Sequence, residues 1–179
     1  MTMQRVRIHF TKGEELRFTG HLDLHKIWER TFRRARLPLA YSQGFHPQPK
    51  IQLACALPLG FTSTSEWMDA WLDSDLAADE IGQILSKTLQ PGLNLISIEP
   101  VPLQATPLQN RVASAIYRLT FTPDVSFDSL EQKKDSMLSK TVLLRERRGK
   151  AYDLRPLIER ADLKEEPGGL VLLLQLSAL

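Results

Sequence analysis

Residues 24–35 read LHKIWERTFRRA, and they carry the clearest helix pattern of the chain. Its apolar and small side chains recur at steps of three and four residues, which places on one face of a helix Leu24, Ile27, Trp28, Thr31, Phe32 and Ala35. Pro38 ends the helix, because proline clashes with the preceding turn. Thr19 or Gly20 is the expected cap, and Asp23 falls in the first turn, where the helix dipole favours an acid.

The segments on both sides of this helix have the spacing of strands. Residues 5–10 alternate polar and apolar side chains, and strands are also expected over residues 16–18, 51–57, 66–72 and 93–98. A second helix is predicted over residues 77–89, where Pro91-Gly92 ends it. The order is β-α-β-β-α-β, which is the split βαβ arrangement of ferredoxin-like domains.

A proline-containing linker over residues 100–107 precedes a second half in which this order repeats. We expect a helix over residues 127–138, a short helical turn over 156–161, and strands over 115–121, 141–145, 150–154 and 170–176. The sequence therefore predicts an α+β protein with two ferredoxin-like domains in tandem and antiparallel sheets. The expected domains are residues 1–103 and a smaller one over residues 104–179.

The composition excludes several classes of protein. Cys55 is the only cysteine of 179 residues, so the chain has no intramolecular disulfide, no dithiol chemistry and no zinc site of several cysteines. No run approaches the ~20 apolar residues that span a bilayer, and the start lacks the apolar core of a signal peptide. No glycine-rich phosphate loop or dinucleotide fingerprint is present. We expect a soluble, cytoplasmic protein without membrane contact or a cofactor of its own.

Charge is distributed unevenly along the chain. Residues 1–60 carry a net charge of +6, residues 61–110 carry −6, and residues 111–179 carry +2. On the first helix Lys26, Arg30 and Arg33 stand at i, i+4 and i+7, with Arg34 beside them. Such a row binds phosphates, because each neutralised phosphate releases counterions. A solvated helix face is the more common use of such a charge run.

The segment 41–50 follows directly and reads YSQGFHPQPK. Two prolines and a glycine argue against regular structure, so it is expected to be a loop. Tyr41, Phe45, His46 and Lys50 place aromatic and basic groups together, which suits single-stranded or looped RNA. The alternative is that Tyr41 and Phe45 fill the core beneath the loop.

Three further clusters of ionisable side chains could carry chemistry. His21 and His25 stand at i, i+4, a spacing that suits a metal, but no third ligand is evident, so no metal site is expected. Acidic residues gather before and in the second helix, where a solvated face is the expected role: Asp69, Asp73, Asp75, Asp79 and Glu80. Residues 145–150, RERRGK, form a basic turn that is expected to be an exposed hairpin end.

Several motifs together resemble one known family. They are RVRIxFxK at 5–12, LRFTGHLD at 16–23, FRRA at 32–35, YSQGFHPQPK at 41–50, ALPLG at 56–60 and DLRP at 153–156. This pattern is similar to the radical-SAM-linked domain, a domain of unknown function fused to the C-terminus of, or encoded beside, bacterial radical-SAM proteins. The resemblance implies a radical-SAM partner. The chain lacks the CxxxCxxC motif that binds the iron–sulfur cluster of radical-SAM enzymes, so it does not hold that cluster itself. Family members tend to run further, which leaves the completeness of the second domain open.

Three functions follow from these patterns. The first is an accessory module that holds RNA for a radical-SAM modification enzyme and has no catalysis of its own. Its surface would comprise Arg17, His21, Lys26, Arg30, Arg33, Arg34, Tyr41, Phe45, His46 and Lys50. The second is a protein-interaction domain that docks the radical-SAM core or a ribosome-related partner through the acidic stretch 66–80. The third is an RNA-processing enzyme with His21 or His46 as general base and Arg17 or Lys50 stabilising charge.

Overall fold

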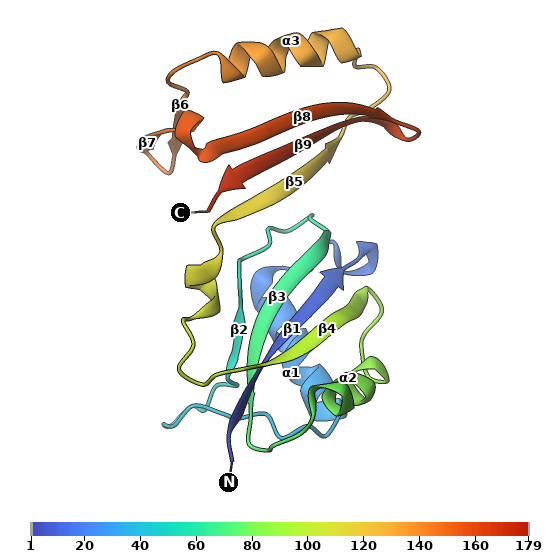
Figure 1. The fold of residues 1–179 in the computed structure, drawn as a ribbon, viewed down its shortest axis with the longest axis vertical. Coiled ribbons are helices and arrows are strands. Elements are labelled where there is room, and N and C mark those ends of the chain that lie inside the picture. The colour runs from blue at the N-terminus through green and yellow to red at the C-terminus, as the bar shows by residue number, and fades with distance from the viewer. Residues whose placement is uncertain (1, 179) are drawn as a thin grey trace. The chain divides into compact units, whose positions relative to one another are not determined.

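A computed structural model describes residues 2–178, which form two compact units, one ending at Arg111 and the other beginning at Val112. Within the described residues there are three α-helices, and all strand pairs are antiparallel (Figure 1). The expected mixed α+β class with antiparallel sheets is therefore confirmed. None of these helices is long and apolar enough to cross a membrane.

The first unit is built on a four-stranded sheet in the order β2-β3-β1-β4. Its strands are β1 (Gln4–Lys12), β2 (Ile51–Leu53), β3 (Ser63–Leu72) and β4 (Leu93–Val101). β1 is central because its alternating side chains serve two faces: Val6, Ile8 and Phe10 are buried in the core. The opposite face carries Arg5 and Arg7.

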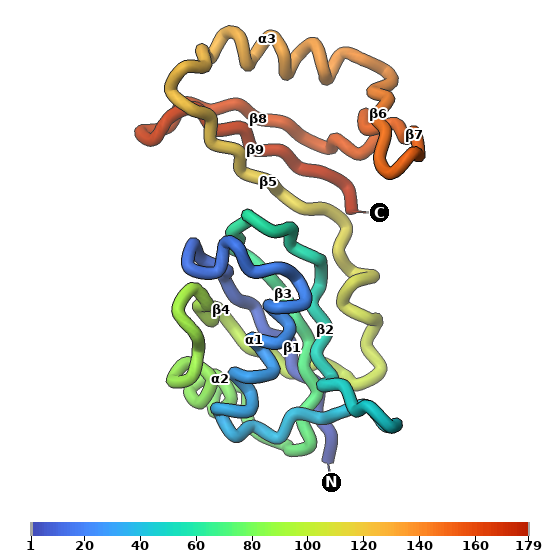
Figure 2. Tube along the Cα trace, turned by 180° about the vertical axis from the view of Figure 1, so that it is seen from behind, coloured from blue at the N-terminus to red at the C-terminus, as the bar shows by residue number. Residues whose placement is uncertain are grey.

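Two helices, α1 (His21–Arg34) and α2 (Ala78–Ser86), cover one face of this sheet (Figures 1 and 2). α1 buries the face predicted from its spacing. The Trp28 ring lies edge-on to Phe10, with centroids 4.9 Å apart, and Phe32 follows one turn later. α1 ends before Arg36, which adopts a left-handed backbone (φ 54°).

The expected strand over residues 16–18 is not formed. Residues Glu14–Leu16 are instead a 3₁₀ turn, η1, in which the backbone NH of Leu16 donates to Gly13 O. The Gly13 NH in turn donates to Gly92 O at 2.7 Å. Leu16 and Phe18 flank Arg17 with the apolar spacing of a strand, but only Leu16 is buried, whereas Phe18 is 78% exposed. A second 3₁₀ turn, η2 (Leu108–Arg111), closes the unit.

The second unit has a three-stranded sheet in the order β5-β9-β8. Its strands are β5 (Ser114–Thr120), β8 (Ile158–Glu166) and β9 (Gly169–Ser177), and α3 (Phe127–Leu138) lies over one face (Figure 1). Ser126 caps α3, since its side chain accepts a hydrogen bond from Ser129 N. A separate hairpin consists of β6 (Leu144–Arg147) and β7 (Lys150–Asp153).

The second unit differs from the expected repeat. The helical turn predicted over residues 156–161 is shortened to the 3₁₀ turn η3 (Arg155–Leu157), and Ile158 already begins β8 with an extended backbone. Residues 112–178 therefore contain one α-helix rather than two. β8 was missed because it is rich in charged residues and because its pairing with β9 shifts register between Ile158 and Arg160, which hides the two-residue period.

Candidate nucleic-acid interface

The cations predicted on the first helix form an exposed row, hereafter the α1 row: Lys26, Arg30 and Arg33. They lie opposite the buried side of α1, which carries Trp28. Lys26 is 4.0 Å from the Asp23 carboxylate, and both side chains are largely in water, so this pair is weak. Within residues 2–178, Arg30 and Arg33 have no carboxylate within 4.0 Å. The row therefore offers two cations without an acidic partner.

Residues 41–50, hereafter the aromatic loop, form a protruding loop with internal hydrogen bonds. Its base is closed by a bridge between Tyr41 and Pro49, and Ser42 and Gln48 exchange hydrogen bonds of 2.8 and 2.9 Å. Figure 2 shows it projecting, in cyan, from the first unit. Phe45 near the tip is wholly exposed, and Tyr41 at the base is 39% exposed. Phe45 therefore does not fill the core, whereas the Tyr41 ring is partly covered at the base of the loop.

The predicted site residues fall into two groups. Arg33, Arg34 and the aromatic loop, which includes His46 and Lys50, lie toward the C-terminal end of α1. Arg17 and His21 lie at its N-terminal end. α1 has 14 residues, so His21 and Arg34 at its two ends are about 20 Å apart along the axis at 1.5 Å per residue.

Two of the predicted cations, Arg17 and Arg34, form hydrogen bonds with the backbone of other segments. Arg34 donates from Nη2 to Thr88 O at 2.9 Å and ties the end of α1 to the segment after α2. Arg17 donates from Nε to Gly60 O at 3.0 Å, and Gly60 N returns a hydrogen bond to Arg17 O. Each guanidinium thus donates to a backbone carbonyl of a neighbouring segment, and Arg17 Nη1 also lies 3.6 Å from Glu14 Oε2.

The histidine pair at the start of α1 does not complete a ligand set. His21 Nδ1 is buried and has no hydrogen-bond partner among the described residues. No group of three or more His, Cys, Asp and Glu side chains that could hold a metal ion occurs within residues 2–178. We derive no metal or general-base chemistry from this pair.

One residue of the predicted acidic cluster, Asp69, is buried in the sheet and is not part of an acidic surface. Asp69 is fully buried and accepts hydrogen bonds of 2.6–3.0 Å from the guanidiniums of Arg5 and Arg7. Its hydrogen bonds raise the pKa of Arg7. Arg5 also donates to Ala105 O and lies over the Trp71 ring. Asp69 is therefore a structural counter-ion, while the exposed part of the cluster is Asp73, Asp75, Asp79 and Glu80.

Sequence analysis also missed an aromatic pair on the helix-free face of the sheet. His9 of β1 and Trp67 of β3 are cross-strand partners, and their rings stack with centroids 4.0 Å apart and an interplanar angle of 3°. His9 Nε2 lies 2.8 Å from Ser65 Oγ. The alternation of residues 5–10 places His9 on the same face as Arg5 and Arg7, but nothing local identifies Trp67 as its partner.

One group of ionisable side chains is perturbed by burial. Lys12 is 1% exposed and donates to Phe61 O at 2.9 Å, and its desolvation lowers the pKa of the ammonium. Burial raises the pKa of both Glu66 and Cys55. A raised thiol pKa reduces the thiolate fraction, so Cys55 is a poor nucleophile. The Lys12 ammonium thus joins the end of β1 to the loop that contains Phe61.

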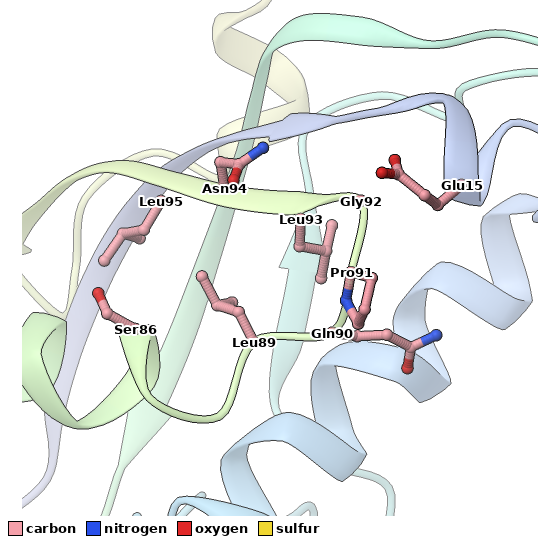
Figure 3. Close-up of a pocket in the computed structure, with 9 residues that line it drawn as sticks. All are labelled: Glu15, Ser86, Leu89, Gln90, Pro91, Gly92, Leu93, Asn94 and Leu95. Atoms are coloured by element: carbon pink, nitrogen blue, oxygen red, sulfur yellow. The ribbon is translucent and has the colours of Figure 1, made fainter.

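Figure 3 shows a hollow of about 610 Å³ beside the segment that joins α2 to β4. Glu15 is the only charged side chain of its lining, and the other polar groups include Ser86, Gln90 and Asn94. No basic group or aromatic ring lines it. It is therefore unsuited to a phosphate or a stacked base, and the α1 row and the aromatic loop remain the candidate nucleic-acid surface of the first unit.

A protein-family model matches the chain. Residues 5–178 match the model of a bacterial protein family described as "Uncharacterized protein conserved in bacteria (DUF2344)". The match spans nearly the whole chain and includes both units. No curated protein matches the chain. The description assigns no activity, so the function has to be argued from the residues.

Proposed function

We propose that this chain, which belongs to the DUF2344 family, holds RNA on the α1 row and the aromatic loop. The observation that carries the proposal is the complete exposure of Phe45 near the tip of a loop that is closed by its own hydrogen bonds. Burying a phenylalanine contributes about 1.5–3 kcal/mol. A ring held in water by an ordered loop forgoes that energy until a ligand covers it.

The chemistry of the surface suits single-stranded or looped RNA. Phe45 and Tyr41 offer π-faces on which bases stack, at about 1–3 kcal/mol per base. Arg30 and Arg33 have no acidic partner within the described chain and can bind phosphates, with Lys26 beside them. Stacking and phosphate contacts both tolerate sequence variation, so this surface would hold RNA by its shape and charge.

The resemblance to the radical-SAM-linked domain suggests what the RNA is held for. The chain has a single cysteine and no CxxxCxxC motif. We therefore place the reaction on a radical-SAM partner, on another chain or another part of the same polypeptide. The element order β1-α1-β2-β3-α2-β4 and the sheet order β2-β3-β1-β4 support a ferredoxin-like first unit as the scaffold.

The test is binding of fluorescently labelled tRNA and an rRNA hairpin, followed by anisotropy at several salt concentrations. The double variant R30A/R33A should bind more weakly, and the slope of log K against log salt should flatten by about 1–2. The control R111A/K87A removes the same charge from two exposed positions of the first unit outside the α1 row. If both variants behave alike, the α1 row does not bind RNA.

A second candidate is docking of the radical-SAM partner on an apolar surface of the first unit. Phe18, Leu22 and Leu59 are 78%, 74% and 64% exposed, and the paired hydrogen bonds between Arg17 and Gly60 bring their segments together. Exposed apolar groups that gather in this way mark interaction sites. F18S/L22S should then abolish co-elution with the partner and leave RNA affinity unchanged. Charge reversal at Asp73 and Asp79 tests the acidic surface in the same assay.

A further inference from the structure

The second unit contains a basic groove that the proposed RNA surface of the first unit does not use. It lies between α3 and β6, has a volume of about 360 Å³, and is lined by three cations, Lys133, Lys140 and Arg145. The polar groups beside them are Ser129, Gln132 and Ser136. No carboxylate lines the groove, so its electrostatic character is uniformly positive.

The two lysines of the groove are unpaired. Within residues 2–178, neither Lys133 nor Lys140 has a carboxylate within 4.0 Å, whereas their neighbour Lys134 is bound by Glu131 and Asp135. Lys133 and Lys140 are seven residues apart. Lys133 lies within α3, which ends at Leu138, and Lys140 follows two residues beyond that end; both line the groove. Glu131 and Asp135 of α3 therefore pair with Lys134 and leave the two groove lysines unpaired.

The wall that carries Arg145 is fixed to α3 by the DLRP stretch. Asp153 Oδ1 accepts hydrogen bonds from Leu143 N at 2.7 Å and from Arg155 N at 3.0 Å. Arg155 donates from Nε to Leu138 O, the last carbonyl of α3, at 3.0 Å. The β6–β7 hairpin stands apart from the sheet beside this end of α3 (Figure 1). Its root is therefore held rigidly enough to keep Arg145 over the groove.

The positive surface continues from the groove to the end of the hairpin. Arg147, Arg148 and Lys150 are exposed, and Arg148 and Gly149 form the turn with φ of 53° and 74°. Within the described chain, none of these three cations has a carboxylate within 4.0 Å. A row that runs from α3 through Arg145 to this turn is too extended for one small anion and suits a polyanion.

We infer that the α3–β6 groove is a second site for the phosphodiester backbone of RNA, an inference that rests on the proposed RNA-holding function. Lysine and arginine neutralise phosphate charge, while the serine hydroxyls and the Gln132 amide donate hydrogen bonds to phosphate oxygens. The groove lining contains no aromatic ring. The site therefore binds the backbone without reading bases, and it adds affinity rather than sequence preference.

The test compares two double variants of the full chain for binding the same labelled tRNA. K133A/K140A removes one groove cation within α3 and one just after its end, and alanine at position 133 preserves α3 because it has the highest helix propensity. R160A/K164A is the matched control, since it removes the same charge from β8 outside the groove. We expect K133A/K140A to flatten the salt slope by about 1.4, at 0.7 per single-strand phosphate contact, and the control to leave it unchanged.

The variants of the two units separate the possible failures. If R30A/R33A weakens binding but K133A/K140A matches its control, the groove is not an RNA site and the proposed surface of the first unit stands. If only K133A/K140A weakens binding, the groove stands and the proposed α1 surface falls. If wild-type protein shows no saturable, salt-dependent binding, both are overturned. Amide NMR shifts confined to α3 and β6 on RNA addition would support the groove independently.

Discussion

Replacing Asp69 by asparagine should lower the free energy of unfolding of the first unit more than any substitution of an exposed residue does. The fully buried carboxylate of Asp69 accepts four hydrogen bonds, two from Arg5 at 3.0 and 2.6 Å and two from Arg7 at 2.9 and 3.0 Å. Both guanidiniums are themselves buried. Asparagine has nearly the same shape but no charge, and it replaces one acceptor oxygen by a donor. The variant therefore leaves two buried cations without a counter-ion.

The size of the effect follows from those contacts. Removing one partner of a buried ion pair costs about 3–5 kcal/mol. Arg5 keeps part of its support, because it donates to Ala105 O at 2.7 Å and lies 4.8 Å from the centroid of Trp71. We therefore expect a loss toward the lower end, about 3 kcal/mol. For a domain with a total stability of about 5–15 kcal/mol this is a large fraction.

Urea unfolding followed by tryptophan fluorescence measures the stability loss of the first structural unit. All three tryptophans, Trp28, Trp67 and Trp71, belong to the first unit, so the signal is specific to it. With a slope of about 1–3 kcal/mol per M urea, D69N should shift the midpoint down by at least about 1 M. D73N is the control, because Asp73 is exposed.

A loss below about 1 kcal/mol in D69N would refute this reasoning, since the two guanidiniums would then be satisfied without the carboxylate. A second variant checks the cause. Replacing Arg5 and Arg7 by methionine in the D69L background removes all three buried charges, and such apolar replacements are often neutral or stabilising. That triple variant should be more stable than D69N if uncompensated charge is the source of the loss.

Three other perturbations follow from the structure. F45A should weaken RNA binding by about 1–3 kcal/mol without shifting the urea midpoint, because the ring is exposed; unchanged affinity would exclude stacking. Burial raises the pKa of Glu66 above its ordinary 4.5, so the folded state favours the protonated acid. As the pH rises from 4 through that raised pKa, the wild type should therefore lose stability relative to E66Q. Urea titrations that show the opposite trend would refute this. G92A should destabilise more than G60A, because both glycines have φ of 88° but only a Cβ at Gly92 would lie 2.9 Å from Leu16 Cγ; equal midpoints would contradict the clash.

The sequence predicted the helices and strands that have a clear pattern within their own residues. The three- and four-residue spacing of residues 24–35 identified α1, and the helix predicted over residues 127–138 matches the bounds of α3. The strands of the first unit were predicted because each alternates or is strongly apolar. β8 failed for the converse reason: its pairing with β9, and not its own sequence pattern, defines it as a strand.

The sequence predicted which residues could form the candidate site. The fold decides which of them stay exposed and unpaired and which are bound to other parts of the chain. Arg30 and Arg33 remain without an acidic partner in the described chain, whereas Arg34 is bound to Thr88 O, 54 positions away. Asp69 was assigned to a surface cluster because its two arginine partners lie more than 60 positions earlier. The exposure of Phe45 likewise depends on how residues 41 and 49 close the loop. Partners distant in sequence cannot be inferred from spacing alone.

The α3–β6 groove shows the same limit in the second unit. Its cations come from α3 and from the basic turn region, which were interpreted separately as a helix and a hairpin. Asp153 and Arg155 join them through hydrogen bonds to Leu143 N and Leu138 O. Without these contacts the sequence offers two ordinary charge runs, and charge runs are usually solvated.

The most direct test of the central claim is ultraviolet cross-linking of the protein to tRNA containing 4-thiouridine, followed by mass spectrometry of the cross-linked peptides. A base stacked on an exposed ring lies in contact with it, so cross-links are expected at Tyr41 and Phe45 of the aromatic loop. F45A should lose the cross-link at that position and R30A/R33A should reduce both. Cross-links absent from residues 41–50 while they form elsewhere on the chain would contradict the proposed surface.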